Sequence, residues 1–204
     1  MIEPKVLRAY VGGVMVLALA VVPGGCGGTR AGSPAIVRGG PVEGEQQVFV
    51  AGEVYFAPQL DADGLARMRD RGVGTVINMR STGEMAELAA GDDEKAGFDE
   101  AAAVQALGMN YVHIPLGRDD GYAPEDVDAF AAAVESACGP VLLHCLSGAR
   151  ARVMWQAYLV RERGYSLDEA VELTRTVGDA PYSIELLLDQ RLRQRPGRRL
   201  KTGG

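Results

Sequence analysis

The chain has 204 residues, of which 47% are hydrophobic and 24% charged, and these proportions exclude a disordered or fibrous protein. Its formal net charge of −6 argues against nucleic-acid binding, which requires a basic surface that displaces counterions. The length suits a single domain with a full hydrophobic core.

The first residues are typical of an export signal. Lys5 and Arg8 precede an apolar run over residues 9–22, which is too short to span a bilayer comfortably and fits the hydrophobic region of a signal peptide. Two glycines then lead to Cys26, as in the lipobox of bacterial lipoproteins. We therefore expect residues 1–26 to be a signal peptide of the lipoprotein type, with Cys26 as the lipidation site. An ordinary secretory signal is the alternative.

The same pattern predicts location and domain boundaries. The protein is expected to be exported to the periplasm or the cell surface, with membrane contact only through the N-terminal anchor. Residues 27–46 are rich in Gly, Ser, Pro and Ala and are expected to form a flexible linker. Residues 47–194 are then expected to form the folded domain, and the basic residues 195–204 a disordered tail.

Strand-prone and helix-prone segments alternate along this domain. We expect strands around residues 48–50 and 54–56, and then at 73–79, 111–114 and 141–144. Helices are expected at 61–72, 99–107, 151–163, 166–177 and 183–194, and from Pro124 to before Gly139, whereas residues 84–97 are expected to be a surface excursion. This succession indicates an α/β fold with a mostly parallel central sheet flanked by helices.

Polar residues follow several of these strands. Arg80, Asp119, Asp120 and Cys145 all come after a strand ends, and ligands of open α/β sheets bind outside the carboxyl ends of the strands. We therefore expect these four residues to converge on one site.

Cys145 lies between a buried strand and a helix. It therefore faces the unpaired amides and the positive dipole end of the helix, which favour the thiolate and can also bind an anion. Gly148 permits a tight turn, and the guanidinium of Arg150 can hold two oxygens of a phosphate or sulfate-like group. Nucleophile and anion cradle coincide in this loop, although a buried, inert cysteine is the structural alternative.

The run of residues 144–150 resembles the signature loop shared by cysteine-based tyrosine phosphatases and rhodanese-like sulfurtransferases. Upstream, residues 74–80 with Glu84, and residues 111–116, are similar to the bacterial beta-lactamase-hydrolase-like phosphatases, which are relatives of dual-specificity phosphatases. The similarity covers roughly residues 47–177. It implies the fold of the phosphotyrosine phosphatase superfamily.

The resemblance also implies a reaction and its residues. A phosphatase of this kind hydrolyses phosphate monoesters, protein phosphotyrosine among them, through a phosphocysteine intermediate. Cys145 would be the nucleophile, Arg150 would stabilise the phosphoryl group, and Asp119 or Asp120 would protonate the leaving oxygen. The substrate, a phosphorylated protein or small molecule, would be bound by a set drawn mostly from the same loop: His144, Leu146, Ser147, Gly148, Ala149 and Arg80.

One departure keeps alternatives open. Tyrosine phosphatases place the arginine six positions after the cysteine, where this chain has Ala151, whereas Arg150 is at the shorter spacing used by rhodaneses. A rhodanese-like sulfurtransferase with a Cys145 persulfide is therefore the second hypothesis, and a non-catalytic anion-binding module the third. The loop aspartates favour the phosphatase, because sulfur transfer needs no acid.

Metal and cofactor chemistry is not expected. Two histidines and three scattered cysteines form no ligand cluster, and no dinucleotide-binding fingerprint follows a strand. Nothing in the sequence indicates the oligomeric state.

Overall fold

The computed structural model describes residues 36–91, 99–177 and 184–188. The predicted signal peptide, the lipidation site Cys26 and the basic tail lie outside the described residues. Within them, none of the helices is both long enough and apolar enough to cross a membrane.

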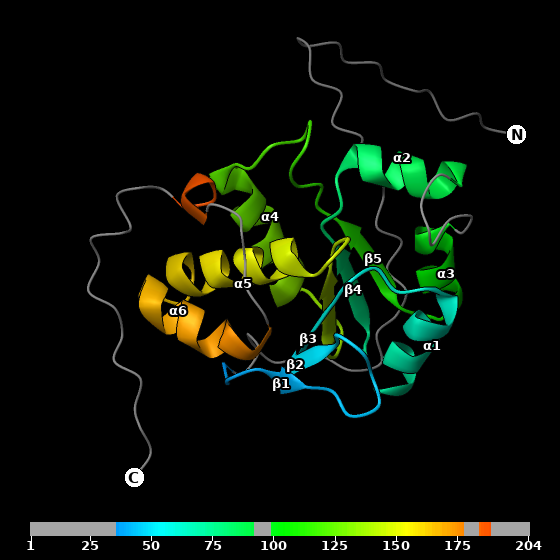
Figure 1. Cartoon of the computed structure of the whole chain (residues 1–204), viewed down its shortest axis with the longest axis horizontal. Coiled ribbons are helices and arrows are strands. Elements are labelled where there is room, and N and C mark those ends of the chain that lie inside the picture. The colour runs from blue at the N-terminus through cyan, green and yellow to red at the C-terminus, as the bar shows by residue number, and fades with distance from the viewer. Residues whose placement is uncertain (1–35, 92–98, 178–183, 189–204) are drawn as a thin grey trace, which may run out of the picture.

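Six strands and six α-helices make up the described fold (Figure 1). The strands are β1 (Gly40–Pro41), β2 (Phe49–Ala51), β3 (Val54–Ala57), β4 (Thr75–Asn78), β5 (Asn110–His113) and β6 (Val141–His144). The helices are α1 (Ala62–Asp70), α2 (Thr82–Ala90), α3 (Glu100–Ala106), α4 (Pro124–Glu135), α5 (Ala149–Arg161) and α6 (Leu167–Thr174), with short 3₁₀ turns η1 (Arg175–Val177) and η2 (Ile184–Leu186).

The strands form one mixed sheet in the order β1-β2-β3-β6-β4-β5. Strands β3, β6, β4 and β5 run parallel, while β1 and β2 are added antiparallel at one edge. All four residues of the central strand β6 are buried, as expected for a strand covered on both faces. The predicted α/β architecture with a mostly parallel sheet is confirmed.

Helices cover both faces of the sheet. Helices α4, α5 and α6 lie on one side and α1 and α3 on the other, while α2 lies across the end where the parallel strands finish (Figure 1). The larger core lies under α4, α5 and α6, where Trp155 stacks on Tyr158 at 5.1 Å between ring centroids and meets Phe56 and Phe130 edge to face. Helix α5 is buried from Arg150 to Val160, so the helix that starts at the predicted cysteine loop is also the centre of the fold.

Two predictions about the ends of the domain need correction. The expected linker includes β1, which pairs with β2 and is followed by the buried residue Val42. Gly40 and Pro41 are residues that favour turns, but proline is tolerated on an edge strand because it need not donate to the ladder. At the other end, the described part of the expected helix 183–194 is the single turn η2, and residues 189–204 lie outside the described residues.

A third correction concerns the start of the expected surface excursion. Residues 82–90 form the helix α2, and Ser81 and Glu84 form its capping box. The spacing Ser-x-x-Glu is a local signal for a helix start, but Gly83 and the following acidic residues obscure it. This helix matters for the site, because its first turn contacts the predicted anion cradle.

Candidate active site

The parallel strands bring the predicted site residues to one end of the sheet. Strand β4 pairs with β6 so that Asn78 lies opposite His144, and the amide of Met79 donates to the carbonyl of His144 at 2.8 Å. Strand β5 lies on the other side of β4 and ends at His113. The segments that follow β6, β4 and β5 therefore begin side by side, as the sequence predicts.

Cys145 is buried at 1% exposure and has a free thiol. Its Sγ atom accepts a hydrogen bond from the amide of Gly148 at 3.1 Å, so the chain turns back over the sulfur. Gly148 has φ +85°, and a Cβ atom there would lie 3.2 Å from the carbonyl oxygen of Ala57. The positive φ strongly favours glycine at this position, and the close approach adds to this preference.

The turn at Gly148 also starts helix α5. Gly148 is the N-cap and provides no capping side chain, so the first amides of this 13-residue helix are left for another acceptor. The helix begins at Ala149, two residues earlier than expected, and Arg150 therefore belongs to its first turn. Leu146 and Ser147 are exposed, and Ala149 is half-buried.

Arg150 is the link between the cradle and α2. Its Nη1 and Nη2 atoms donate to Oε2 and Oε1 of Glu84 at 2.5 and 2.7 Å, and Nη1 also donates to the carbonyl of Leu116 at 2.7 Å. Burial alone would lower the pKa of Arg150, but the hydrogen bond to Glu84 and the electrostatic interactions with Cys145 and Glu84 raise it above its usual range. A guanidinium has five N–H groups, so these contacts leave the edge formed by Nε and Nη2.

Glu84 is the partner that the sequence did not predict. Its carboxylate is buried, and besides Arg150 it accepts the amide of Ser81 at 2.7 Å. Burial alone would raise the pKa of Glu84, but the hydrogen bonds from Arg150 and Ser81 and the charge of Arg150 lower it to about 2. One carboxylate thus completes the capping box of α2 and fixes the orientation of the cradle arginine.

The loop with the two predicted acids packs on this pair. The amide of Gly117 donates to the carbonyl of Gly121 at 2.8 Å, which closes a tight turn around Arg118, Asp119 and Asp120. Arg118 has φ +46°. The loop rises beside the start of α2 (Figure 1).

The two aspartates of this turn have different surroundings. Both carboxylate oxygens of Asp120 accept from Thr82, one from its amide and one from its hydroxyl, each at 2.8 Å. Asp119 is exposed, and its carboxylate accepts no hydrogen bond from the part of the chain that the structure describes. The sequence could not distinguish the two residues, but the structure gives only Asp120 a hydrogen-bonded partner.

Arg80 lies deeper than a surface substrate contact would. Arg80 is only 1% exposed. Its guanidinium donates to Oε1 of Gln59 at 2.9 Å and to the carbonyl of Glu84 at 3.1 Å. In this arrangement Arg80 braces the start of α2 from below. Substrate contact by Arg80 stays a prediction that would require the side chain to move.

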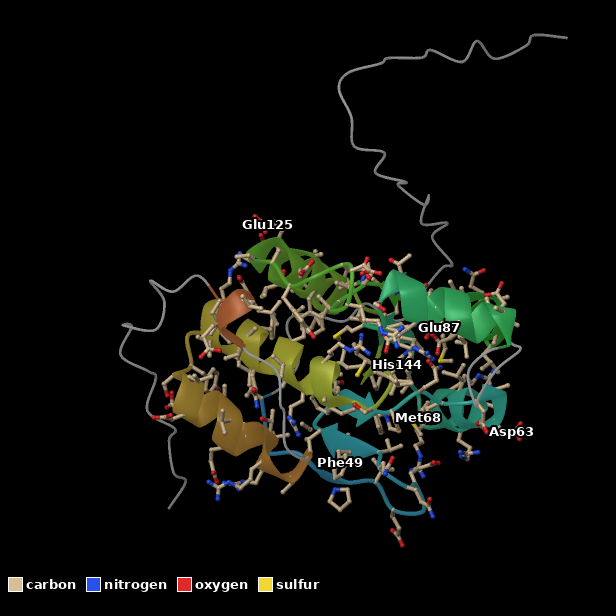
Figure 2. All side chains as sticks on the ribbon, turned by 45° about the horizontal axis from the view of Figure 1, so that its top comes forward. Phe49, Asp63, Met68, Glu87, Glu125 and His144 are labelled. Carbon is tan, nitrogen blue, oxygen red and sulfur yellow. The ribbon has the colours of Figure 1, made fainter. Side chains whose placement is uncertain are left out.

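A second buried carboxylate, Glu100, lies below the cradle. It accepts from Gln59 at 2.5 Å, from Asn78 at 2.6 Å and from the hydroxyl of Tyr111 at 3.1 Å. Its Oε1 also lies 3.4 Å from Nε2 of His144, which Figure 2 shows in the interior of the molecule. Burial lowers the pKa of His144 despite the opposing charge of Glu100, so the imidazole is a neutral, packed part of the site.

The sequence did not indicate the members of this lower network. Gln59, Asn78 and Glu100 come from three segments separated by up to 41 positions, and no short motif joins them. Among residues 36–91, 99–177 and 184–188, no group of three or more His, Cys, Asp or Glu side chains could hold a metal ion.

The arrangement defines a class of protein. A cysteine at the end of a central parallel strand, a helix N-terminus beyond it and an arginine in the first helical turn form the cradle of tyrosine-phosphatase-like hydrolases. The family model of the beta-lactamase hydrolase-like protein, phosphatase-like domain, matches residues 47–159. The chain therefore belongs to this family, and to the class of tyrosine-phosphatase-like hydrolases.

Individual relatives agree with this assignment. The beta-lactamase hydrolase-like protein of Xylella fastidiosa (strain Temecula1 / ATCC 700964) is 28% identical over 120 residues, which are 59% of this chain and 26% of that protein. The chain thus matches about a quarter of the length of this relative. P. aeruginosa TpbA shares the fold, with a TM-score of 0.53 and 18% identity over 70% of this chain and 82% of that structure. Tk-PTP is similar, with a TM-score of 0.51 and 20% identity over 71% of this chain and 94% of that structure.

Proposed function

We propose that this protein is a cysteine-dependent phosphatase that hydrolyses phosphate monoesters. The observation that carries the proposal is the division of the Arg150 guanidinium. Glu84 accepts one hydrogen each from Nη1 and Nη2, and Leu116 accepts the second hydrogen of Nη1. The edge formed by Nε and the second hydrogen of Nη2 is left for a bidentate acceptor near Cys145. A phosphoryl group offers two oxygens with the required spacing.

The reaction then follows from the residues at the cradle. The thiolate of Cys145 attacks phosphorus, and the bond between phosphorus and the leaving oxygen breaks. Asp119 gives its proton to that oxygen, while Arg150 and the first amides of α5 stabilise the charge on the transferring group. Water then attacks the phosphocysteine, Asp119 takes the proton of the water, and the bond from sulfur to phosphorus breaks to release inorganic phosphate.

Asp119 is the acid that we favour over Asp120. A general acid must carry a proton to the substrate and therefore needs an oxygen that is not already an acceptor. Both oxygens of Asp120 accept from Thr82, whereas Asp119 is exposed on the same turn. The substrate class remains a phosphorylated protein or small molecule, and a structure of TpbA in complex with pTyr supports a phosphotyrosine test substrate.

The short spacing from Cys145 to Arg150 supports sulfur transfer as the second candidate function. The experiment compares the full-length protein with Cys145→Ser on phenyl phosphate, on phosphotyrosine and on thiosulfate with cyanide. We expect phosphate release that the variant loses. Thiocyanate formation without phosphate release would instead establish the sulfurtransferase, and binding of phosphate without either reaction would establish an anion-binding module.

We also propose that the protein is exported and anchored at Cys26, which rests on the sequence pattern of residues 1–26 alone. Replacing Cys26 by Ser should release the protein from the membrane fraction and remove the mass of the acyl chains. Unchanged membrane association of the variant would argue against acylation.

A further inference from the structure

The candidate active site contains a closed ring of hydrogen bonds. Arg150 donates to Glu84, and Glu84 accepts the amide of Ser81 at 2.7 Å. The next residue, Thr82, donates to Asp120, whose own amide donates to the carbonyl of Gly117 at 3.0 Å. The preceding carbonyl, that of Leu116, accepts from Arg150 and completes the ring. Hydrogen bonds and short backbone segments therefore connect the Cys145–Arg150 cradle, helix α2 and the acid loop formed by residues 117–121.

Asp120 joins the acid loop, residues 117–121, to the first turn of α2, while the exposed pair of Arg118 and Glu87 contacts the helix further along. Thr82 is the first residue of α2, so its amide is one of the helix N-terminal donors that have no partner within the helix. Asp120 accepts this amide and the Thr82 hydroxyl together, and its negative charge lies at the positive end of the helix dipole. A residue 38 positions away thus adds to the capping of α2.

The position of Asp119 depends on this contact. Asp119 has no hydrogen-bonded partner within the described residues, and so its location is set by the rest of its turn, where the neighbouring Arg118 makes only an exposed pair with Glu87. One end is held by Arg150 through Leu116, and the other by Thr82 through Asp120. Displacing a reacting group by about 1 Å can cost roughly a hundredfold in rate.

We propose that Asp120 is a positioning residue that fixes the acid loop on α2 through Thr82, and thereby places Asp119 over the cradle. The expected effect on the rate rests on the proposed phosphatase function. The docking of the loop on α2 does not depend on that function. This inference assigns different roles to two adjacent aspartates that the sequence treats as equivalent, and it makes Thr82 part of the same device.

The kinetic test compares Asp120→Asn, Thr82→Val and the double variant in the full-length protein, with Asp119→Asn as the acid variant. Each is assayed on phenyl phosphate, whose leaving group needs a proton, and on 2,4-dinitrophenyl phosphate, whose leaving group does not. Asp119→Asn should lower kcat on phenyl phosphate by about a hundredfold or more. Asp120→Asn should lower it by about tenfold to a hundredfold, with little change in KM and a much smaller loss on the dinitrophenyl ester.

The partner residue supplies the decisive comparison. Thr82→Val should lower kcat as Asp120→Asn does, and the double variant should lose less than the two single losses combined, because both changes weaken the same contact. Thr82→Ser keeps the hydroxyl and should restore the wild-type rate. Asp70→Asn, on the exposed end of α1, is the matched control for loss of a carboxylate charge.

Two outcomes would overturn the proposal. Additive effects of the Thr82 and Asp120 variants would show that they do not act through one contact. A loss in Asp120→Asn that Thr82→Val does not reproduce, with Asp119→Asn active, would make Asp120 the acid itself.

Amide hydrogen exchange tests the docking of the loop independently of phosphatase activity. The amides of Gly117 and Asp120 are hydrogen-bonded within the turn, and they should exchange faster in Asp120→Asn and Thr82→Val than in wild type. Unchanged exchange would refute the docking role even in an active phosphatase. If no variant or wild-type protein released phosphate but exchange rose as expected, the proposed function would fail and the positioning contact would stand.

Discussion

Glu84 and Glu100 are two buried carboxylates near the cradle whose hydrogen-bond partners differ. Both are in the first turn of a helix at the carboxyl end of the sheet, and they are 3% and 1% exposed. Glu84 meets a full positive charge on Arg150. Glu100 is instead surrounded by neutral donors of Gln59, Asn78 and Tyr111.

This difference gives the two carboxylates different roles: Glu84 orients Arg150, and Glu100 stabilises the surrounding fold. A bidentate pair fixes the orientation of the guanidinium, so Glu84 determines which edge of Arg150 would face a substrate. Gln59 follows β3, Asn78 ends β4 and Tyr111 lies within β5, so this carboxylate links three segments of the sheet beside His144. Burial and then the charge of Glu100 raise the pKa of Tyr111, which keeps that hydroxyl a donor throughout the physiological range.

The largest expected effect on stability is at Glu100. Glu100→Ala would leave the buried donors of Gln59, Asn78 and Tyr111 without their acceptor, at about 1 to 3 kcal/mol each. Because some of these donors will find water, we expect a loss of roughly 3 to 5 kcal/mol in the free energy of unfolding. Urea denaturation measures it, with the exposed Glu135→Ala on α4 as control. A loss no larger than that of the control would contradict the supporting role.

A smaller and pH-dependent effect is expected at Glu84. The pKa of Glu84 is about 2 in the folded protein, against an ordinary value of 4.5. The pair therefore stabilises the fold fully above about pH 4.5, and this contribution, about 3 kcal/mol from the two pKa values, is lost as the pH falls toward 2. Glu84→Gln should remove this part of the acid dependence.

The measurement for Glu84 is urea denaturation of both proteins between pH 2 and pH 6. The wild-type and Glu84→Gln stabilities should converge as the pH falls, because protonation removes the pairing that the variant lacks. Parallel curves over this interval would mean that Glu84 is not held ionised by Arg150.

The smallest effect is expected at the exposed pair of Arg118 and Glu87. Their side chains are each 49% exposed and lie 2.7 Å apart, and such pairs contribute little because water and salt screen them. Glu87→Gln should leave the urea midpoint unchanged within error and leave kcat unchanged. A loss of stability comparable to that of Glu84→Gln would show that this surface pair is part of the ring.

Short-range sequence patterns were sufficient to predict most of the fold and to single out Cys145 as the proposed nucleophile. The run from Cys145 to Arg150 lies within one strand, one turn and one helix start, so its short-range pattern was sufficient to predict an anion cradle. The capping box of Ser81 and Glu84 was equally local, but the acidic, glycine-containing sequence around it favoured a surface excursion instead.

The contacts that organise the site are long-range, and the sequence could not show them. The bond from Arg150 to Glu84 spans 66 positions and that from Thr82 to Asp120 spans 38. Each depends on which parallel strands are neighbours. Because β4 lies between β6 and β5, the segment after β4 contacts both the cradle and the acid loop, and alternation of strands and helices does not reveal this order.

The short edge strand β1 has a consequence for assembly. It contributes only Gly40 and Pro41 to the sheet, and the proline nitrogen has no hydrogen to offer a further strand. An edge this short, with a proline in it, gives another molecule little to pair with. We therefore do not expect two copies of the described domain to associate edge to edge on this side of the sheet.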